Sequence, residues 1–295
     1  MSRKRILIMG ATGMLGHSLF NQLCKLGRYD VFGTARSILG LEHFFTETEI
    51  KRIRVNVDAD NFDTVVRAMA GIQPDIVINC IGLIKQLPIS SDPLTAINVN
   101  AQLPHRISMI CKAANARLIH ISTDCVFDGK SGNYIEADTP SSNDLYGRTK
   151  FLGEMTYPHC ITLRTSIIGH ELKAKLGLVE WFLTQKDFVR GYTRAIYSGF
   201  PTVELANIIE RYVLPDDSLS GLYHVSSEPI SKYDLLHLVK KYYKKSISIE
   251  AYDDFVCDRS MNSDRFRNLT GYVPPDWNAL VAMMYDDFVA RYGRQ

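Results

Sequence analysis

The amino-acid sequence predicts an α/β fold, a doubly wound parallel β-sheet followed by a smaller C-terminal α+β lobe. Three observations lead to this prediction. Short apolar runs alternate with helical patterns over about the first 165 residues, a glycine turn directly follows the first run, and the alternation is lost after Gly169. A chain of 295 residues is long enough for one large domain with a smaller companion. We therefore expect one domain over residues 1–169 and a lobe over 170–295, and we allow elements of the lobe to return to the first domain.

The apolar runs of the first domain have the length of β-strands, and helical patterns separate them. The predicted strands lie at residues 5–9, 29–35, 52–57, 74–80, 117–122 and 160–164. The first predicted helix ends at Gly27, and the others lie at 62–70, at 94–114 and around Tyr146. Strands that are joined through helices run parallel, with helices on both faces of the sheet. The lobe carries predicted helices at 178–185, 202–213, 231–245 and 277–292, with a strand-like run at 221–226.

The charge balance is that of an ordinary globular protein and argues against a nucleic-acid partner. Hydrophobic residues make up 46% of the chain, charged residues make up 22%, and the formal net charge is +2. A nucleic-acid-binding face needs a basic stripe, whereas the basic residues here are dispersed apart from short clusters. The cluster within residues 240–245 is better explained as the solvated end of a helix, where cations interact favourably with the helix dipole.

The cysteine pattern and the apolar runs indicate a soluble, cytoplasmic protein. The six cysteines show no C-x-x-C pair, so buried free thiols in a reducing compartment are expected. No stretch approaches the roughly 20 apolar residues that span a bilayer. The N-terminus has a basic start, but its apolar run from Ile6 to Met9 breaks on glycine, which argues against a signal peptide.

The glycine turn Gly10-Ala-Thr-Gly13-Met-Leu-Gly16 predicts a site for the pyrophosphate of a dinucleotide. Glycine lets phosphate approach the backbone, and the following helix offers free N–H groups and the positive end of its dipole. Thr12, Met14 and Leu15 are therefore cofactor candidates as well. The alternative is a tight turn without a ligand, but the position directly after the first strand favours the nucleotide.

The end of the second predicted strand favours NADPH, with NADH as the alternative. An acidic residue there would bind the adenosine ribose, whereas this chain has Arg36 and Ser37, and arginine suits a 2′-phosphate. A plain surface role for Arg36 is the competing interpretation. Further candidates follow the third and fourth strands, where ordinary loop roles compete. They are Val57 and Asp58 for the adenine edge, and Cys80, Ile81 and Gly82 for the wall of the adenosine pocket.

Tyr146 and Lys150 form the candidate proton donor. On a helix they share one face a turn apart, and Ser122 and Thr123 end the fifth predicted strand. A Tyr-x-x-x-Lys pair alone is expected about once by chance in this composition. Its context favours a site, because the carboxyl ends of parallel strands all open on one edge of the sheet.

With these motifs in this order, the chain resembles the dTDP-4-dehydrorhamnose reductase family of extended short-chain dehydrogenases/reductases. The resemblance covers about two-thirds of the chain and implies a Rossmann-like NAD(P)-binding domain followed by a mainly substrate-binding lobe. The matching stretches are GATGMLG at 10–16, NCIG at 79–82, NVNAQLP at 98–104, STDCVFDG at 122–129, GNYIEADTP at 132–140, YGRTKFLGE at 146–154, LRTSIIG at 163–169, SGFPT at 198–202 and DRSMNSDRF at 258–266. Cys125 departs from the family, which often has an aromatic residue there, and this bears on the identity of the sugar.

The resemblance implies a reduction, by NADPH, of the 4-keto group of a nucleotide-activated 4-keto-6-deoxyhexose. Tyr146 would be the general acid, and Lys150 would lower its pKa and bind the nicotinamide ribose. Thr123 would donate a hydrogen bond to the carbonyl oxygen. Asn98 would hold a water that relays protons to Lys150, although a capping or packing asparagine is a strong competitor. Thr165 is a further cofactor candidate.

The resemblance also points to residues that would bind the nucleotide sugar. Besides Thr123 and Tyr146, the candidates are Lys85, Gln86, Cys125, Val126, Arg164, Thr165, Trp181, Thr202 and Arg259. Trp181 at a lobe interface and Arg259 at the surface are the ordinary alternatives. His170 and His224 show no metal-ligand spacing, so no metal site is predicted, and a homodimer is compatible with the sequence.

Three other functions remain open on the sequence alone. They are the reduction of a UDP-linked N-acetylated 4-keto-6-deoxysugar, a nucleotide-sugar epimerase or dehydratase activity, and a non-catalytic nucleotide-binding subunit that regulates a partner enzyme. Epimerases and dehydratases of this type hold NAD tightly, which Arg36 argues against. The retained Thr123, Tyr146 and Lys150 argue against a pure binder. The base, the stereochemistry of the sugar and the oligomeric state are not determined by the sequence.

Overall fold

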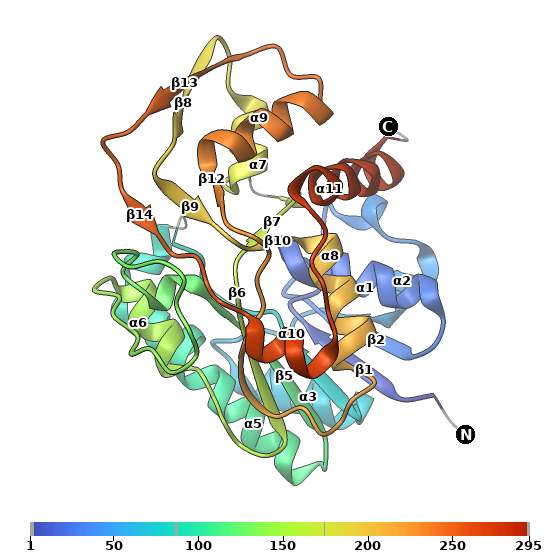
Figure 1. Ribbon diagram of the computed structural model, residues 1–295. Helices are drawn as coiled ribbons and strands as arrows, with labels where there is room; N and C mark the ends of the chain where they lie inside the picture. The colour runs from blue at the N-terminus through green and yellow to red at the C-terminus, as the bar shows by residue number, and fades with distance from the viewer. Residues whose placement is uncertain (1–2, 86–87, 174, 294–295) are drawn as a thin grey trace.

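Seven parallel strands form the central sheet of the computed structural model, which describes residues 3–85, 88–173 and 175–293 (Figure 1). In the order of the chain they are β1 (Arg5–Met9), β2 (Asp30–Thr34), β3 (Ile53–Arg54), β4 (Ile76–Asn79), β5 (Arg117–Thr123), β6 (Cys160–Thr165) and β11 (Gly221–His224). In space their order is β11-β6-β5-β4-β1-β2-β3. The predicted α/β fold with a doubly wound parallel sheet is confirmed.

Both faces of the sheet are buried, which explains why its strands appear in the sequence as continuous apolar runs. Ile6 and Ile8 of β1 point into one hydrophobic core, and Leu7 and Met9 point into the other. All four side chains are fully buried. Helices must therefore cover both faces.

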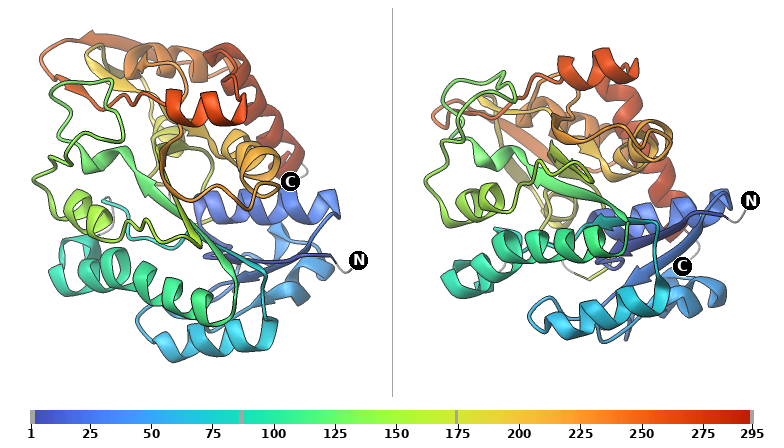
Figure 2. Two further views of the ribbon diagram at one scale, coloured as in Figure 1. Left: turned by 60° about the horizontal axis from the view of Figure 1, so that its bottom comes forward. Right: turned by 90° about the horizontal axis from the view of Figure 1, so that it is seen from below.

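The two helical layers lie on either side of the sheet (Figure 2). The first layer contains α1 (Met14–Leu26), α8 (Thr202–Ile208) and α11 (Trp277–Tyr292). The second contains α3 (Phe62–Ile72) and α5 (Leu103–Ala113). The short α2 (Glu47–Arg52) precedes β3, and α6 (Leu145–Leu152) follows β5.

The long helix predicted over residues 94–114 is divided into three parts. It consists of α4 (Pro93–Ala96), a π-helical turn over Ile97–Gln102, and α5. The turn ends just before Pro104, which has no backbone N–H to donate to the helix. A π-turn changes which side chains share a helix face, and this affects the site described below.

The lobe consists of short strands and helices, most of which lie beyond the carboxyl edge of the sheet, whereas α10 packs against β11 (Figure 1). Its strand pairs are β8 (Phe188–Tyr192) with β13 (Ser248–Tyr252), and β7 (Ile167–Ile168) with β10 (Phe200–Pro201). A third group contains β12 (Ile230–Ser231), β9 (Ala195–Tyr197) and β14 (Cys257–Asp258), and the helices are α7 (Leu178–Thr184), α9 (Lys232–Tyr242) and α10 (Asp264–Thr270). Residues 221–224 return to the central sheet, where β11 pairs with β6. The lobe and the sheet are therefore joined through a shared edge strand.

Two properties bear on the cysteine and membrane predictions: the state of the cysteines and the length of the helices. The six cysteines are free thiols, and Cys111 and Cys160 are fully buried. Within the described ranges, no helix combines the length and the apolar character needed to cross a membrane.

Candidate active site

The predicted site residues follow strands that end on one edge of the sheet. Gly10 follows β1, Arg36 follows β2, Asp58 follows β3, Cys80 follows β4, and Thr123 ends β5. Strand order reverses between β1 and β4, because β2 and β3 lie on one side of β1 while β4, β5 and β6 lie on the other. Ligands of doubly wound sheets bind at such a switch point.

The glycine turn brings α1 close to the end of β1. Gly10 has a φ of 80°, and a Cβ on it would lie 3.1 Å from Cγ1 of Ile81. A Cβ on Gly16 would lie 2.0 Å from the carbonyl oxygen of Gly10, so only glycine permits this approach. Gly13 caps α1 with an extended backbone and is exposed. The first turn of α1 therefore presents a helix N-terminus, suited to an anion, at the edge of the sheet.

The other residues of the glycine turn differ in exposure. Thr12 and Met14 are partly buried, whereas the side chain of Leu15 lies in the core, so only its backbone is available to a ligand. A Cβ on Gly177 would lie 2.8 Å from Cε of Met14. The lobe therefore borders the glycine turn.

The segment after β2 leaves two polar side chains exposed. Arg36 and Ser37 are both exposed, and the Ser37 hydroxyl accepts the N–H of Leu39. Val57 is buried, and the carboxylate of Asp58 accepts the N–H of Asp60 at 3.1 Å. Arg36 is therefore placed at the rim of the edge where a phosphate could reach it.

The segment after β4 is held by a buried asparagine. The side-chain oxygen of Asn79 accepts the N–H of Ile81 at 3.1 Å, and the N–H of Cys80 donates to the carbonyl of Met9. Gly82, next along, is exposed. These contacts keep the backbone of residues 80–82 beside the glycine turn.

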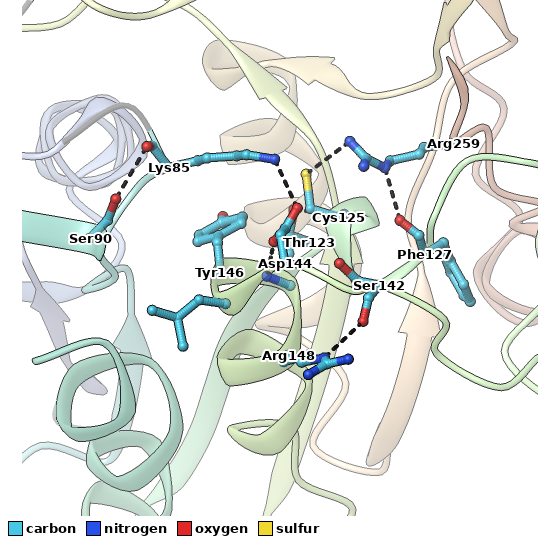
Figure 3. A network of polar contacts seen from close by, with 12 residues as sticks. Lys85, Ser90, Thr123, Cys125, Phe127, Ser142, Asp144, Tyr146, Arg148 and Arg259 are labelled. Atoms are coloured by element: carbon cyan, nitrogen blue, oxygen red, sulfur yellow. Dashed lines mark hydrogen bonds and ion pairs between the residues drawn. The ribbon is translucent and has the colours of Figure 1, made fainter. Parts of the chain in front are cut away.

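The structure brings Tyr146 to Thr123 at the end of β5 (Figure 3), and Lys150 lies one turn after Tyr146 on α6. The carboxylate of Asp144 caps α6 by accepting the N–H of Gly147 at 2.8 Å, and this sets the position of the helix beside the end of β5. The phenol of Tyr146 shares a hydrogen bond with the Thr123 side chain. Lys150 is buried, and its Nζ donates to the carbonyl of Ile121 at 2.8 Å.

Burial controls the charge of the two titratable groups in this set. It lowers the pKa of Lys150 to about 8, and the negative charge of Glu154 opposes this effect. Burial raises the pKa of Tyr146, and the hydrogen bond with Thr123 opposes that rise. The expectation of a lowered Tyr146 pKa is therefore not met, because desolvation outweighs the favourable contacts. A phenol that stays protonated at neutral pH is suited to donate a proton.

Asn100, and not the predicted Asn98, lies on the side of the helix that faces Gly82 and Lys150. The side chain of Asn98 donates to the carboxylate of Asp60 at 2.8 Å, away from the proposed relay position. Asn100 is buried, and its side-chain oxygen accepts the N–H of Leu83 at 2.9 Å. A Cβ on Gly82 would lie 3.5 Å from this oxygen and 3.8 Å from Nζ of Lys150. Sequence reasoning missed Asn100, because the π-helical turn changes which side chain faces the sheet.

Two cationic side chains approach the Tyr146 region from two sides (Figure 3). Lys85 donates to the carboxylate of Asp144 at 2.8 Å. Nε of Arg259 donates to the carbonyl of Phe127 at 2.9 Å, and its Nη1 lies 3.8 Å from Sγ of Cys125. Burial raises the pKa of the Cys125 thiol to about 12, so the thiol is neutral. Gln86, the remaining candidate from this segment, lies outside the described residues.

Arg164 has a structural position that differs from the expected substrate contact. Its side chain is 2% exposed, and its guanidinium donates to both carboxylate oxygens of Glu154, at 2.8 and 2.7 Å. A further nitrogen of Arg164 lies 3.2 Å from Nε2 of His224, and the Ser122 hydroxyl donates to Glu154 at 2.6 Å. These buried partners engage all three guanidinium nitrogens, so the structure places Arg164 in a buried ion pair rather than in an open position.

The remaining candidates fall into buried and accessible groups. Val126 is fully buried in a small apolar cluster with Phe127, Tyr134 and Met261, so its side chain does not reach the edge. Thr202 is 5% exposed, and a Cβ on Gly169 would lie 2.7 Å from its hydroxyl. Thr165 ends β6 and is also buried, at 2% exposure. Trp181 on α7 is 37% exposed and is therefore accessible to a ligand.

A cavity of about 780 Å³ lies at the opposite, amino edge of the sheet. It is lined in part by Lys4, which precedes β1, by Arg117, which begins β5, and by Lys112. None of the predicted site residues that the structure describes lines it. Across the residues that the structure describes, no group of three or more His, Cys, Asp or Glu side chains is placed to hold a metal ion.

Activity should fall as pH rises through about 8, because the buried Lys150 loses its charge there. Its pKa is lowered, so the cationic form is complete below this pH and is lost above it. The measurement is the pH dependence of kcat/KM for the reaction that this site catalyses. Lys150→Ala should remove this decline, whereas Lys150→Arg should retain activity at higher pH. A decline near pH 8 that persists in Lys150→Ala would show that another group causes it.

A known family model matches nearly the whole chain. The family model described as "RmlD substrate binding domain" matches residues 4–289. The dTDP-4-dehydrorhamnose reductase of Aggregatibacter actinomycetemcomitans is 31% identical over 244 residues, covering 78% of this chain and 76% of that protein. The methionine adenosyltransferase 2 subunit beta of Danio rerio is 28% identical over 247 residues, covering 79% and 72%.

Comparison with solved structures supports the fold. The crystal structure of dTDP-4-dehydrorhamnose reductase from Bacillus anthracis, in complex with NADP, superposes with a TM-score of 0.79. It is 21% identical and covers 97% of this chain and 99% of that one. The shared fold therefore extends over the sheet and the lobe together.

Proposed function

The chain belongs to the RmlD substrate-binding domain family, and on this premise we propose that it is an NADPH-dependent reductase of a nucleotide-activated 4-keto-6-deoxyhexose. It would reduce the 4-keto group and so make a sugar for surface polysaccharide. The observation that carries the proposal is the set of Thr123, Tyr146 and Lys150 at the edge where the glycine turn opens.

The residues at this edge fit a dinucleotide cofactor. The N-terminus of α1 and the close approach allowed by Gly10 and Gly16 suit a pyrophosphate, and Arg36 suits a 2′-phosphate. The exposed backbone at Gly82, beside Lys150, leaves room for the ribose of the nicotinamide. When bound, the nicotinamide ring supplies the hydride for the ketone carbon.

The chain's own residues would handle the proton. Tyr146 donates its phenol proton to the ketone oxygen as negative charge develops there, and the Lys150 ammonium stabilises the phenolate that remains. Thr123, which is hydrogen-bonded to Tyr146, is a candidate to donate a second hydrogen bond to the same oxygen. Glu154 helps to keep Lys150 charged.

We propose the residues that bind the substrate from their charge and their accessibility. Lys85 and Arg259 carry positive charge on two sides of Tyr146 and suit the diphosphate of a nucleotide sugar. Cys125 is proposed to border the sugar, and the accessible Trp181 is proposed to contact the base or the sugar.

Arg36→Asp should weaken NADPH binding roughly 10²-fold relative to NADH, which is the effect expected from losing a charged, bidentate contact. The measurement is the affinity of each cofactor by fluorescence titration. The matched control is Arg67→Asp, which reverses the charge of an exposed arginine elsewhere, on α3. It should change both affinities little. Equal weakening of NADPH and NADH by Arg36→Asp would refute the 2′-phosphate contact.

The proposed function is tested by NADPH consumption against a panel of dTDP- and UDP-linked 4-keto-6-deoxysugars. The panel includes an N-acetylated UDP sugar, and NMR of the product gives its stereochemistry. Turnover of one class identifies the base and the sugar. If no ketosugar supports NADPH oxidation, the proposal is wrong.

A second candidate function is a nucleotide-binding subunit of another enzyme. The similarity to a protein named as a subunit of methionine adenosyltransferase 2 favours it. Purified protein that retains a nucleotide but oxidises no NADPH would support this alternative. Tightly held NAD with no net consumption would instead indicate an epimerase or dehydratase.

A further inference from the structure

A histidine and an asparagine lie side by side in the central sheet, next to apolar core residues. His120 of β5 is paired in register with Asn79 of β4, and both side chains are fully buried. Two residues earlier on the same face, Leu118 and Val77 belong to the hydrophobic core. Polar side chains are unfavourable at such a place unless they are hydrogen-bonded, so the hydrogen bonds of this pair should explain its presence.

These hydrogen bonds fix both the orientation of the Asn79 amide and the tautomer of His120. The N–H of Ile81 donates to Oδ1 of Asn79 at 3.1 Å, and the amide nitrogen of Asn79 lies 3.2 Å from Nδ1 of His120. An amide nitrogen can only donate, so Nδ1 accepts and carries no proton. The proton of the neutral imidazole is therefore on Nε2.

The rest of the imidazole offers no reason for a histidine at this position. Nε2 of His120 is buried and has no hydrogen-bond partner within residues 3–85, 88–173 and 175–293, and a buried donor without a partner is unfavourable. Burial lowers the pKa of His120 well below its ordinary value, and the charge of Lys150 acts in the same direction, so the ring is neutral. The hydrogen bond from Asn79 to Nδ1 is therefore the interaction that accounts for the histidine.

The N–H that Asn79 holds lies between two parts of the proposed cofactor site. A Cβ on Gly10 would lie 3.4 Å from the backbone nitrogen of Ile81 and 3.1 Å from its Cγ1, so Ile81 packs against the glycine turn. One residue later, a Cβ on Gly82 would lie 3.8 Å from Nζ of Lys150. A displaced Ile81 backbone would therefore disturb both the glycine turn and the backbone beside Lys150.

We propose that His120 is a positioning residue of the cofactor site, which acts through Asn79 to fix the N–H of Ile81 and thereby the backbone of residues 80–82. This inference rests on the proposed dinucleotide site. His120 is fully buried within the sheet, so it influences the cofactor only through its neighbour.

Two substitutions of His120 separate this role from simple packing. His120→Phe keeps a flat ring but removes the acceptor, so it should weaken NADPH binding about fivefold, as expected for the loss of one hydrogen bond, and speed hydrogen exchange at the Ile81 amide. His120→Gln offers an amide oxygen to Asn79 and should restore both properties. The matched control is His159→Phe at the amino edge of the sheet, which should change neither.

A double-mutant cycle tests whether His120 acts through Asn79. In Asn79→Leu the N–H of Ile81 has already lost its acceptor, so adding His120→Phe should weaken NADPH binding no further. A further loss of full size would overturn the proposal. So would a His120→Gln protein that binds NADPH as weakly as His120→Phe.

Two measurements need no bound cofactor. If the unaltered protein binds no NADPH, the proposed function fails, but hydrogen exchange at the Ile81 amide still decides this inference. Equal exchange in His120→Phe and the unaltered protein would refute it. Nitrogen NMR of the unaltered protein should show the His120 proton on Nε2, and a proton on Nδ1 would overturn the proposal without any variant.

Discussion

Replacing Tyr146 with phenylalanine is expected to lower kcat by roughly 10²–10⁴-fold, which is the contribution typical of a positioned general acid. The change removes the phenol oxygen and leaves the ring. Lys150 keeps its hydrogen bond to the carbonyl of Ile121, so NADPH affinity should change little. The measurements are steady-state NADPH oxidation with the preferred ketosugar and a fluorescence titration with NADPH.

The matched control is Tyr157→Phe. Tyr157 is 46% exposed and lines the cavity at the amino edge of the sheet, far from the proposed chemistry. Its loss of a hydroxyl should leave kcat unchanged. Turnover by Tyr146→Phe at the level of this control would remove Tyr146 from the mechanism.

Replacing Arg164 with methionine is expected to lower the free energy of unfolding by about 3–5 kcal/mol. The substitution leaves the carboxylate of Glu154, whose side chain is 8% exposed, without its bidentate partner. It also removes the contact with His224, which joins β6 to β11. Chemical denaturation gives the change in stability directly.

A second variant distinguishes a buried pair from a substrate contact. Arg164→Met combined with Glu154→Leu removes both charges, so it should recover much of the lost stability. Lys4→Met breaks the exposed pair with Asp217 and should cost only about 0–1 kcal/mol. If Arg164→Met raised KM for the ketosugar without loss of stability, Arg164 would be a substrate ligand after all.

Much of the first domain can be predicted from the sequence because its strands are buried on both faces. Such strands appear as short apolar runs, and the predicted run at 5–9 coincides with β1. The short strands of the lobe had no comparable signal. β12 and β14 have two residues each, and their pairing with β9 depends on contacts between distant segments.

In the candidate site, too, local features could be predicted from the sequence and contacts between distant segments could not. The glycine turn and the Tyr146–Lys150 pair could be predicted, because each depends on spacing within one short stretch. The buried position of Arg164 could not, because its partners come from the segment just after α6 and from β11. Nor could the sequence show that Asn100, rather than Asn98, lies beside Lys150, since this depends on the π-helical turn.

The main strands of the first domain, the glycine turn, and the spacing of a phenol and an ammonium on one helix could all be predicted from the sequence. Which polar groups meet depends on how the whole chain packs. This packing brought Asp124 against Thr123, paired Arg164 with Glu154, and raised the pKa of Tyr146 by burial. The physical reason is that local spacing sets positions within one element, whereas hydrogen bonds and desolvation depend on how separate elements pack.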